Sequence, residues 1–129
     1  MNNVEQLLVS ARHAAKAAHC PYSNFHVGAA VLCDDGSMIS GCNVENASYG
    51  LSICAERVAL FSAIAQGKRP LALAVSCADA QTSRERGTKM PCGACRQVMQ
   101  ELLPNNAKIH IDGVGTRTLN QLLPEGFQL

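Results

Sequence analysis

The chain has 129 residues, of which 47% are hydrophobic and 16% are charged, and its formal net charge is +1. This length predicts one domain over residues 1–129, which would bury roughly two-thirds of its surface on folding. Eleven Lys and Arg balance ten Asp and Glu, and they form no basic run. The charge pattern therefore argues against a protein that binds nucleic acid.

Cysteine usage bears on the compartment. There are seven cysteines, and the N-terminus lacks a basic region followed by an apolar stretch. An odd cysteine count without a signal peptide argues against a disulfide framework. No apolar run approaches the roughly 20 residues of a membrane-spanning helix. We therefore expect a cytoplasmic protein without a membrane segment, whose thiols stay reduced.

The chain opens with a predicted helix and a predicted hairpin. Apolar residues recur at helical spacing over 3–18, which indicates an amphipathic helix. A strand over 26–33 is followed by the turn signal Asp34-Asp35-Gly36 and a second strand over 37–43. Both faces of the first strand are largely apolar, so we expect layers to cover it on both sides.

The middle of the chain predicts a helix, a strand and a loop. Ser52 and Gly67 mark the expected start and end of a helix over 53–66. Because this helix is apolar all round, we expect it at the centre of the core or of an assembly. Residues 71–77 resemble a buried strand, and residues 79–90 are polar and typical of a loop.

The last third predicts a helix and two short strands. Pro91 opens a helix over 92–103, and alternating apolar residues over 109–111 indicate a strand with one exposed face. A strand near 116–118 should return antiparallel, and 119–123 form about one helical turn. The order of elements predicts an α/β fold with three α/β/α layers and a mixed five-stranded sheet.

Two cysteine motifs carry the chemistry: Cys54-Ala55-Glu56-Arg57 and Pro91-Cys92-Gly93-Ala94-Cys95-Arg96. Both fall at predicted helix starts, where the partial positive charge of the helix end favours thiolates. Three thiolates give a tetrahedral zinc ion three protein ligands and leave the fourth position to water. That arrangement is typical of a catalytic zinc site rather than a closed structural one.

Residues beside the cysteines have predicted roles of their own. Glu56 would carry protons next to the water on the metal. Arg57 and Arg96 would donate hydrogen bonds to thiolate sulfurs and offset the surplus negative charge.

Two alternatives remain open for the cysteine motifs. The first is a closed structural zinc whose fourth ligand is a histidine, with these candidates: His13, His19, His26 and His110. The second is a redox pair formed by Cys92 and Cys95, which leaves Cys54 and Glu56 without a task. The remaining four cysteines are interpreted as small core residues: Cys20, Cys33, Cys42 and Cys77.

Along nearly its whole length, the sequence resembles the small, zinc-dependent, homotetrameric cytidine deaminases. The segments that carry this resemblance are the two cysteine motifs, with Gln97, together with residues 22–30, 43–47 and 122–127. The resemblance implies one Zn²⁺ per subunit on Cys54, Cys92 and Cys95, with Glu56 as the catalytic proton carrier. The implied reaction is hydrolytic deamination of cytidine and 2′-deoxycytidine to uridine and 2′-deoxyuridine with release of ammonia, a step of pyrimidine salvage.

The resemblance also implies the substrate contacts. Asn43 and Glu45 match a ribose-binding pair, and the Glu45 carboxylate would repel a 5′-phosphate and so favour free nucleosides. Phe25 would line the base pocket, and the Ala55 backbone would contact the base. Phe127 matches an aromatic residue that stacks on the base from a neighbouring subunit, so the sites of the homotetramer would be shared.

Three other functions are weighed against this one. A blasticidin S deaminase resembles the chain in length and zinc motif, but Asn43 with Glu45 favours a ribose ligand. A nucleic-acid or nucleotide deaminase is disfavoured by Cys54, where histidine is usual, and by the lack of a basic surface. The alternative from a different class is a zinc-stabilised binding module without turnover, which release of ammonia from cytidine would exclude.

Overall fold

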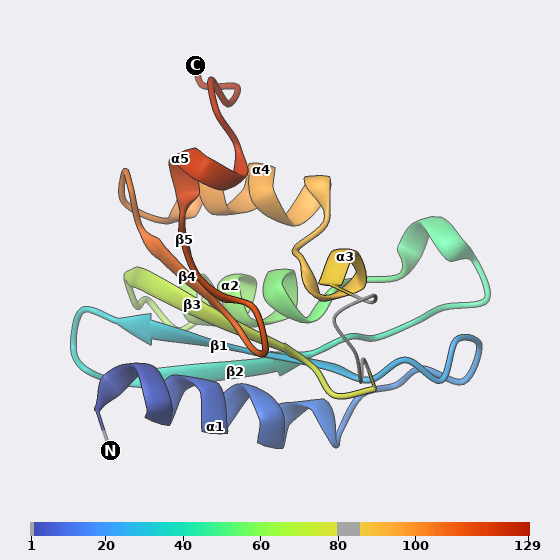
Figure 1. Ribbon diagram of the computed structural model, residues 1–129. Helices are drawn as coiled ribbons and strands as arrows, with labels where there is room; N and C mark the ends of the chain where they lie inside the picture. Colours follow the sequence, from blue (N-terminus) through green and yellow to red (C-terminus); the bar gives the residue numbers. More distant parts are fainter. Residues whose placement is uncertain (1, 80–85) are drawn as a thin grey trace.

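The protein has three layers, in which one sheet lies between helices on its two faces (Figure 1). The structure is a computed structural model that describes residues 2–79 and 86–129. Its sheet has five strands in the order β2-β1-β3-β4-β5. The β3–β4 pair is parallel and the other neighbouring pairs are antiparallel. The predicted mixed five-stranded sheet between helices is therefore confirmed.

The strands lie where the sequence predicts them. Their bounds are β1 Val27–Cys33, β2 Met38–Cys42, β3 Pro70–Cys77, β4 Lys108–Ile111 and β5 Gly115–Thr118. The turn after β1 returns the chain as β2, and β5 returns antiparallel to β4, both as predicted. β1 lies between β2 and β3, and five of its seven residues are buried. Layers on both sides cover it, as its two apolar faces predict.

The helices differ from the prediction mainly at their ends. Their bounds are α1 Asn3–Ala15, the 3-10 turn η1 Tyr49–Leu51, α2 Ala55–Ala65, α3 Arg86–Lys89, α4 Gly93–Leu102 and α5 Leu119–Leu122. Within the described residues, no helix combines the length and the apolar character that a bilayer crossing requires.

Two helix predictions need correction. Cys54, not Ser52, is the N-cap of α2. The Ser52 hydroxyl instead accepts a hydrogen bond from the Asn46 backbone N–H at 3.0 Å, because Ser52 still belongs to the turn before the helix. The segment 79–90, predicted as a loop, contains the short helix α3. Residues 80–85 of that segment lie outside the described part of the chain.

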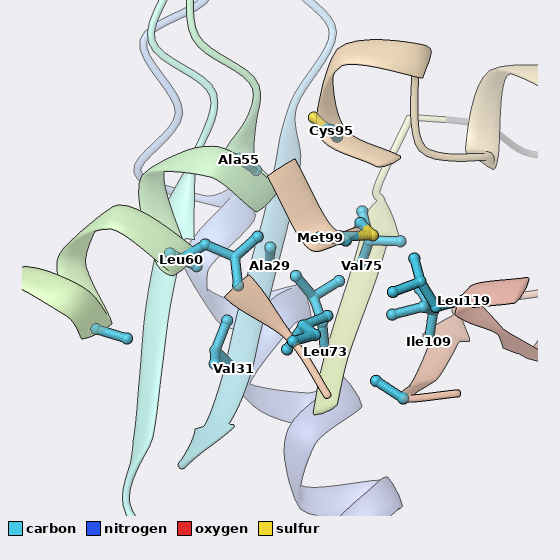
Figure 2. Close-up of a cluster of buried hydrophobic side chains, with 14 of the residues drawn as sticks. Ala29, Val31, Ala55, Leu60, Leu73, Val75, Cys95, Met99, Ile109 and Leu119 are labelled. Atoms are coloured by element: carbon cyan, nitrogen blue, oxygen red, sulfur yellow. The ribbon is translucent and has the colours of Figure 1, made fainter. Parts of the chain in front are cut away.

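The two faces of the sheet carry different cores. On one face, Leu7 and Ala11 of α1 pack against Ala30 and Ala74. On the other face, α2 and α4 cover a larger cluster to which the sheet contributes Val31, Leu73, Val75 and Ile109 and the helices contribute Leu60 and Met99 (Figure 2). Burial of this apolar cluster holds the first turns of α2 and α4 in place.

Two glycines allow the helices to approach the sheet closely. A Cβ at Gly28 would lie 1.9 Å from the carbonyl oxygen of Ala11 in α1. A Cβ at Gly41 would lie 2.5 Å from the backbone nitrogen of Ala59 in α2. No side chain fits at such distances, so glycine at both positions sets the helix-to-sheet spacing.

The predicted exposed face of β4 is wrong at His110, which is 6% exposed. His110 pairs in register with Ala74, which belongs to the face that α1 covers. Its ring Nδ1 lies 2.8 Å from the Thr116 hydroxyl on β5. The alternation along β4 shows which of its side chains share a face of the sheet. It does not show whether the more polar of the two faces is exposed to solvent.

Candidate active site

Three cysteine sulfurs meet where the N-termini of α2 and α4 converge. Cys54 is the N-cap of α2, Cys92 is the N-cap of α4, and Cys95 lies in the first turn of α4. The Sγ atoms of Cys54 and Cys92 are 3.7 Å apart, and those of Cys92 and Cys95 are 3.5 Å apart. All three sulfurs lie within 4.8 Å of one another. The predicted grouping of the three cysteines is confirmed.

The sulfur spacing fits zinc. Zn–S bonds of about 2.3 Å in a tetrahedral site separate two sulfurs by about 3.8 Å. The observed distances of 3.5 and 3.7 Å agree with that value, and they are far longer than a disulfide bond of about 2.05 Å. In the described part of the chain, no histidine or carboxylate joins the three thiols as a fourth metal ligand. The donor set is therefore that of an open zinc site, and the structure gives no support to the closed site with a histidine.

The surroundings of Cys54 favour its thiolate. The neighbouring thiol of Cys95 is the main cause that lowers the pKa of Cys54, and the same contact raises the pKa of Cys95. Arg57 also donates to Cys54 Sγ at 3.3 Å, and this bond raises the Arg57 pKa. A divalent cation would draw the remaining thiol protons off, because sulfur binds metal as thiolate.

Arg96 does not share the role of Arg57, contrary to the sequence prediction. Its Nε donates to the Pro91 carbonyl oxygen, and its Nη1 donates to the Leu122 carbonyl oxygen, each at 2.8 Å. Arg96 therefore fastens the residue before Cys92 to the segment that leads to the C-terminus.

Glu56 lies beside the sulfur cluster and lines a cavity. It belongs to the first turn of α2 and is 4% exposed. Burial is the main cause that raises its pKa to about 7, because a charged carboxylate loses hydration there. A carboxyl that faces a cavity next to three metal ligands is placed to exchange protons with a ligand of that cavity.

The cavity has a volume of about 270 Å³, just below the range of roughly 300–1,000 Å³ for small-molecule pockets. Its lining includes seven of the residues predicted for the site: Phe25, Asn43, Glu45, Cys54, Ala55, Glu56 and Cys92. The third predicted ligand, Cys95, is fully buried behind it. No Lys, Arg or His is among the described lining residues.

The spacing of Asn43 and Glu45 has a structural cause. The segment around Val44 pairs with His19 on one side and with Ile53 on the other, so its backbone is extended. Alternate side chains of an extended segment point to opposite sides. Asn43 and Glu45 therefore both line the cavity, whereas Val44 between them is 43% exposed.

Both of these polar side chains also hold the loop before β1. Asn43 Oδ1 accepts from the Val27 backbone N–H at 2.9 Å, and Asn43 Nδ2 donates to the Phe25 carbonyl oxygen at 2.8 Å. The Glu45 carboxylate accepts from the backbone N–H groups of Tyr22 and Ser23, at 3.1 and 3.2 Å. The wall that contains Phe25 is thus fixed by polar bonds.

Phe127 does not line the cavity of its own chain. Its side chain is 68% exposed, in the C-terminal segment that extends away from the sheet in Figure 1. Gln97 Nε2 of α4 donates to the Phe127 carbonyl oxygen at 3.1 Å. Within a single chain, the structure therefore brings together the predicted site residues other than Phe127.

Sequence reasoning missed part of the wall and assigned Cys77 to the core. Cys77 lines the cavity together with Thr88 and Met90, and its thiol donates to the Thr88 carbonyl oxygen at 3.4 Å. Cys42 is also only partly buried, so only Cys20 and Cys33 are core residues as predicted. The available signal was position, because Cys77 ends a buried strand at the edge of the sheet near the cysteine motifs.

Comparison with known proteins agrees with the geometry of the site. Residues 1–110 match the family model of the cytidine and deoxycytidylate deaminase zinc-binding region. The chain is 44% identical over 127 residues to a cytidine deaminase of Halalkalibacterium halodurans, covering 95% of this chain and 92% of that protein. It is 46% identical over 121 residues to a cytidine deaminase of Mycobacterium tuberculosis, covering 93% and 86%.

Solved structures agree with the sequence matches. The crystal structure of cytidine deaminase from Mycobacterium tuberculosis has a TM-score of 0.85 and 42% identity, with 100% of both chains covered. That of cytidine deaminase from Burkholderia pseudomallei has a TM-score of 0.82 and 43% identity, with 98% of this chain and 100% of that chain covered.

Proposed function

The chain belongs to the cytidine deaminase family of zinc-dependent hydrolases, and we propose that it converts cytidine and 2′-deoxycytidine to uridine and 2′-deoxyuridine with release of ammonia. One observation carries the proposal: three cysteine sulfurs at zinc spacing share a cavity with the buried carboxyl of Glu56. Metal, proton carrier and ligand space are thus adjacent, as the hydrolysis of an amidine carbon requires.

The residues divide the chemistry between them. Cys54, Cys92 and Cys95 would hold one zinc ion, which when bound would lower the pKa of its water to about 7 and so supply hydroxide at neutral pH. Glu56 takes the two protons of the attacking water in turn, delivering one to N3 and the other to the amino group. Ammonia leaves, and uridine keeps the oxygen of the water. Arg57 donates a hydrogen bond to the Cys54 sulfur and so helps to stabilise its thiolate form.

The remaining wall of the cavity binds the substrate. Phe25 and the backbone of Ala55 contact the base, and Asn43 and Glu45 contact the sugar. With Glu45 at the wall and no cationic side chain among the described lining residues, a 5′-phosphate would meet repulsion without a compensating partner. This charge pattern favours a nucleoside over a nucleotide.

We propose a homotetramer with shared sites. Apolar side chains on α2 and near the cavity mouth are exposed in the single chain, which supports subunit contacts there: Tyr22 at 53%, Tyr49 at 78%, Leu51 at 65%, Phe61 at 47% and Ile64 at 47%. Phe127 would then complete the cavity of a neighbour. The reduced thiols that zinc requires also favour the cytoplasm.

An assay against four compounds tests the activity. Purified protein with measured zinc content is incubated with cytidine, 2′-deoxycytidine, CMP or blasticidin S, and absorbance and ammonia are followed. We expect one ammonia per nucleoside converted and little reaction with CMP. Turnover of blasticidin S alone would favour that alternative, and zinc binding without ammonia release would favour a non-catalytic module.

Complementation tests the shared site. Glu56→Gln removes the proton carrier, and Phe127→Ala removes the proposed contribution of a neighbour. When the two variants assemble together, some sites should combine Glu56 from one chain with Phe127 from another. The activity of the mixture should therefore exceed the sum of the activities of the two variants measured separately. Activity equal to that sum would refute the sharing, and native mass measurement gives the number of subunits.

A further inference from the structure

The hydroxyl of Ser23 joins two residues of the cavity wall. Ser23 Oγ donates to Glu45 Oε2 at 2.5 Å and accepts from the Phe25 backbone N–H at 3.0 Å. Ser23 does not line the cavity itself, but it lines an adjoining cleft that shares Glu45 and Ser52 with the cavity. Its hydroxyl thus supports the cavity wall from behind.

The bonds at Glu45 leave room for about one further donor. Each carboxylate oxygen has about two acceptor positions. Oε1 already accepts the backbone N–H groups of Tyr22 and Ser23, and Oε2 accepts the Ser23 hydroxyl. One position therefore remains, on the oxygen that Ser23 holds.

The Glu45 side chain is also fixed from its backbone. The Glu45 N–H donates to the His19 carbonyl oxygen at 2.7 Å, and Val44 before it is paired on both sides. The hydrogen bond from Ser23 is the main cause that lowers the pKa of Glu45, so the group stays an anion at neutral pH. Such an anion is a strong acceptor for a hydroxyl donor.

We propose that Ser23 is a positioning residue for the nucleoside: its hydroxyl turns Glu45 so that the one remaining acceptor position receives a single sugar hydroxyl. This inference rests on the proposed sugar role of Glu45. It assigns Ser23 a function through substrate affinity and not through the metal or the proton transfer.

A double-mutant cycle tests the proposal. Ser23→Ala should raise KM for cytidine about tenfold and change kcat less than twofold, with zinc content and melting temperature recorded for every variant. In a Glu45→Gln background, the same Ser23→Ala change should alter kcat/KM less than twofold, because Ser23 acts through the carboxylate. Ser23→Thr keeps the hydroxyl and should restore most of the affinity.

A matched control lies in the hairpin turn. Ser37 Oγ donates to Asp35 Oδ1 at 2.6 Å, the same kind of bond at an exposed site outside the cavity lining. Ser37→Ala should leave KM and kcat unchanged. If Ser23→Ala lowers the amount of folded protein, Ser23→Cys keeps the volume with a weaker donor and should raise KM less than Ser23→Ala.

The outcomes separate this inference from the function on which it rests. The positioning role would be overturned if Ser23→Ala had the same effect on kcat/KM in the Glu45→Gln background as in the unaltered protein. It would also be overturned if Ser23→Ala did not change KM. If Glu45→Gln itself leaves KM unchanged, the proposed sugar role of Glu45 fails instead. If Glu45→Gln raises KM while Ser23→Ala and Ser23→Cys do not, only the inference on Ser23 falls.

Discussion

The two ends of the cavity are built by different means. The cysteine end stands on helix N-termini that the core holds. It is lined by Cys54, Glu56 and Cys92, with Cys95 behind them. The loop end is held by side-chain bonds to backbone groups. It is lined by Phe25, Asn43 and Glu45, with Ser23 behind them. Glu56 and Cys95 are buried, whereas Ser23 at the loop end is exposed.

Because they are built differently, the two ends of the cavity should respond differently to substitution. Apolar burial under α2 and α4 fixes the ligands and the proton carrier together, so their geometry is maintained without substrate. Hydrogen bonds at an exposed loop contribute about 1 kcal/mol each and are easier to lose. We therefore expect changes at the cysteine end to abolish metal binding or turnover, and changes at the loop end to weaken affinity.

The largest effect is expected from loss of a metal ligand. Cys92→Ser should reduce zinc well below one per chain and abolish activity, because two sulfurs hold the ion poorly. The matched control is Cys42→Ser, since Cys42 is a partly buried cysteine outside the sulfur cluster. Metal analysis and ammonia release measure both variants. Full zinc content in Cys92→Ser would contradict the three-sulfur site.

Glu56→Gln should keep the metal and lose turnover. The amide retains the shape of the side chain but cannot accept and release protons, and general acid–base catalysis contributes roughly 10²–10⁴-fold in rate. We expect kcat to fall by about 10³-fold with zinc content unchanged. A rate near that of the unaltered protein would remove Glu56 from the chemistry.

Asn43→Ala should affect the loop end alone. It leaves the Val27 N–H and the Phe25 carbonyl oxygen without their partner, which costs about 1–3 kcal/mol of unfolding free energy. KM for cytidine should rise about tenfold, while zinc content and kcat change little. Denaturant unfolding and steady-state kinetics measure these effects, and loss of zinc in this variant would show that the two ends are not separable.

The smallest effect is expected far from both ends. Asp112 binds the Arg12 guanidinium at 2.7 and 2.9 Å and the Ser76 hydroxyl at 2.8 Å, which joins α1 to the sheet. The bond from Arg12 is the main cause that lowers the pKa of Asp112. Arg12 is half exposed, so solvent screens the ion pair. Asp112→Asn should therefore lower the unfolding free energy by only about 1 kcal/mol at pH 7, and it should leave KM and kcat unchanged.

The difference in unfolding free energy between Asp112→Asn and the unaltered protein should depend on pH in a definite direction. A carboxyl with a lower pKa in the folded state binds fewer protons when folded, so its stabilisation is complete above the ordinary value of 3.8. The stabilisation is lost as the pH falls through 3.8 towards the folded-state value. The unfolding free energies of Asp112→Asn and the unaltered protein should therefore converge at low pH, and a constant difference would argue against the ion pair.

The sequence by itself determined the ligand set and most elements of the fold. Periods of two and of 3.6 residues are local, so strands and helices could be predicted to within a few residues. The motif positions at helix starts also predicted that Cys54, Cys92 and Cys95 gather around one metal. The family resemblance implied that Asn43 and Glu45 act as a pair, and the extended backbone seen in the structure explains why these residues, two apart, reach one cavity.

Only the tertiary structure decided which distant residues face each other. It brought Cys77 and Met90 into the cavity wall, gave Arg57 but not Arg96 a thiolate partner, and buried His110 on the sheet face that carries α1. These neighbours follow from the order of strands and from the faces that the helices cover. Local patterns do not encode them, because a side chain's period fixes its face but not what packs on that face.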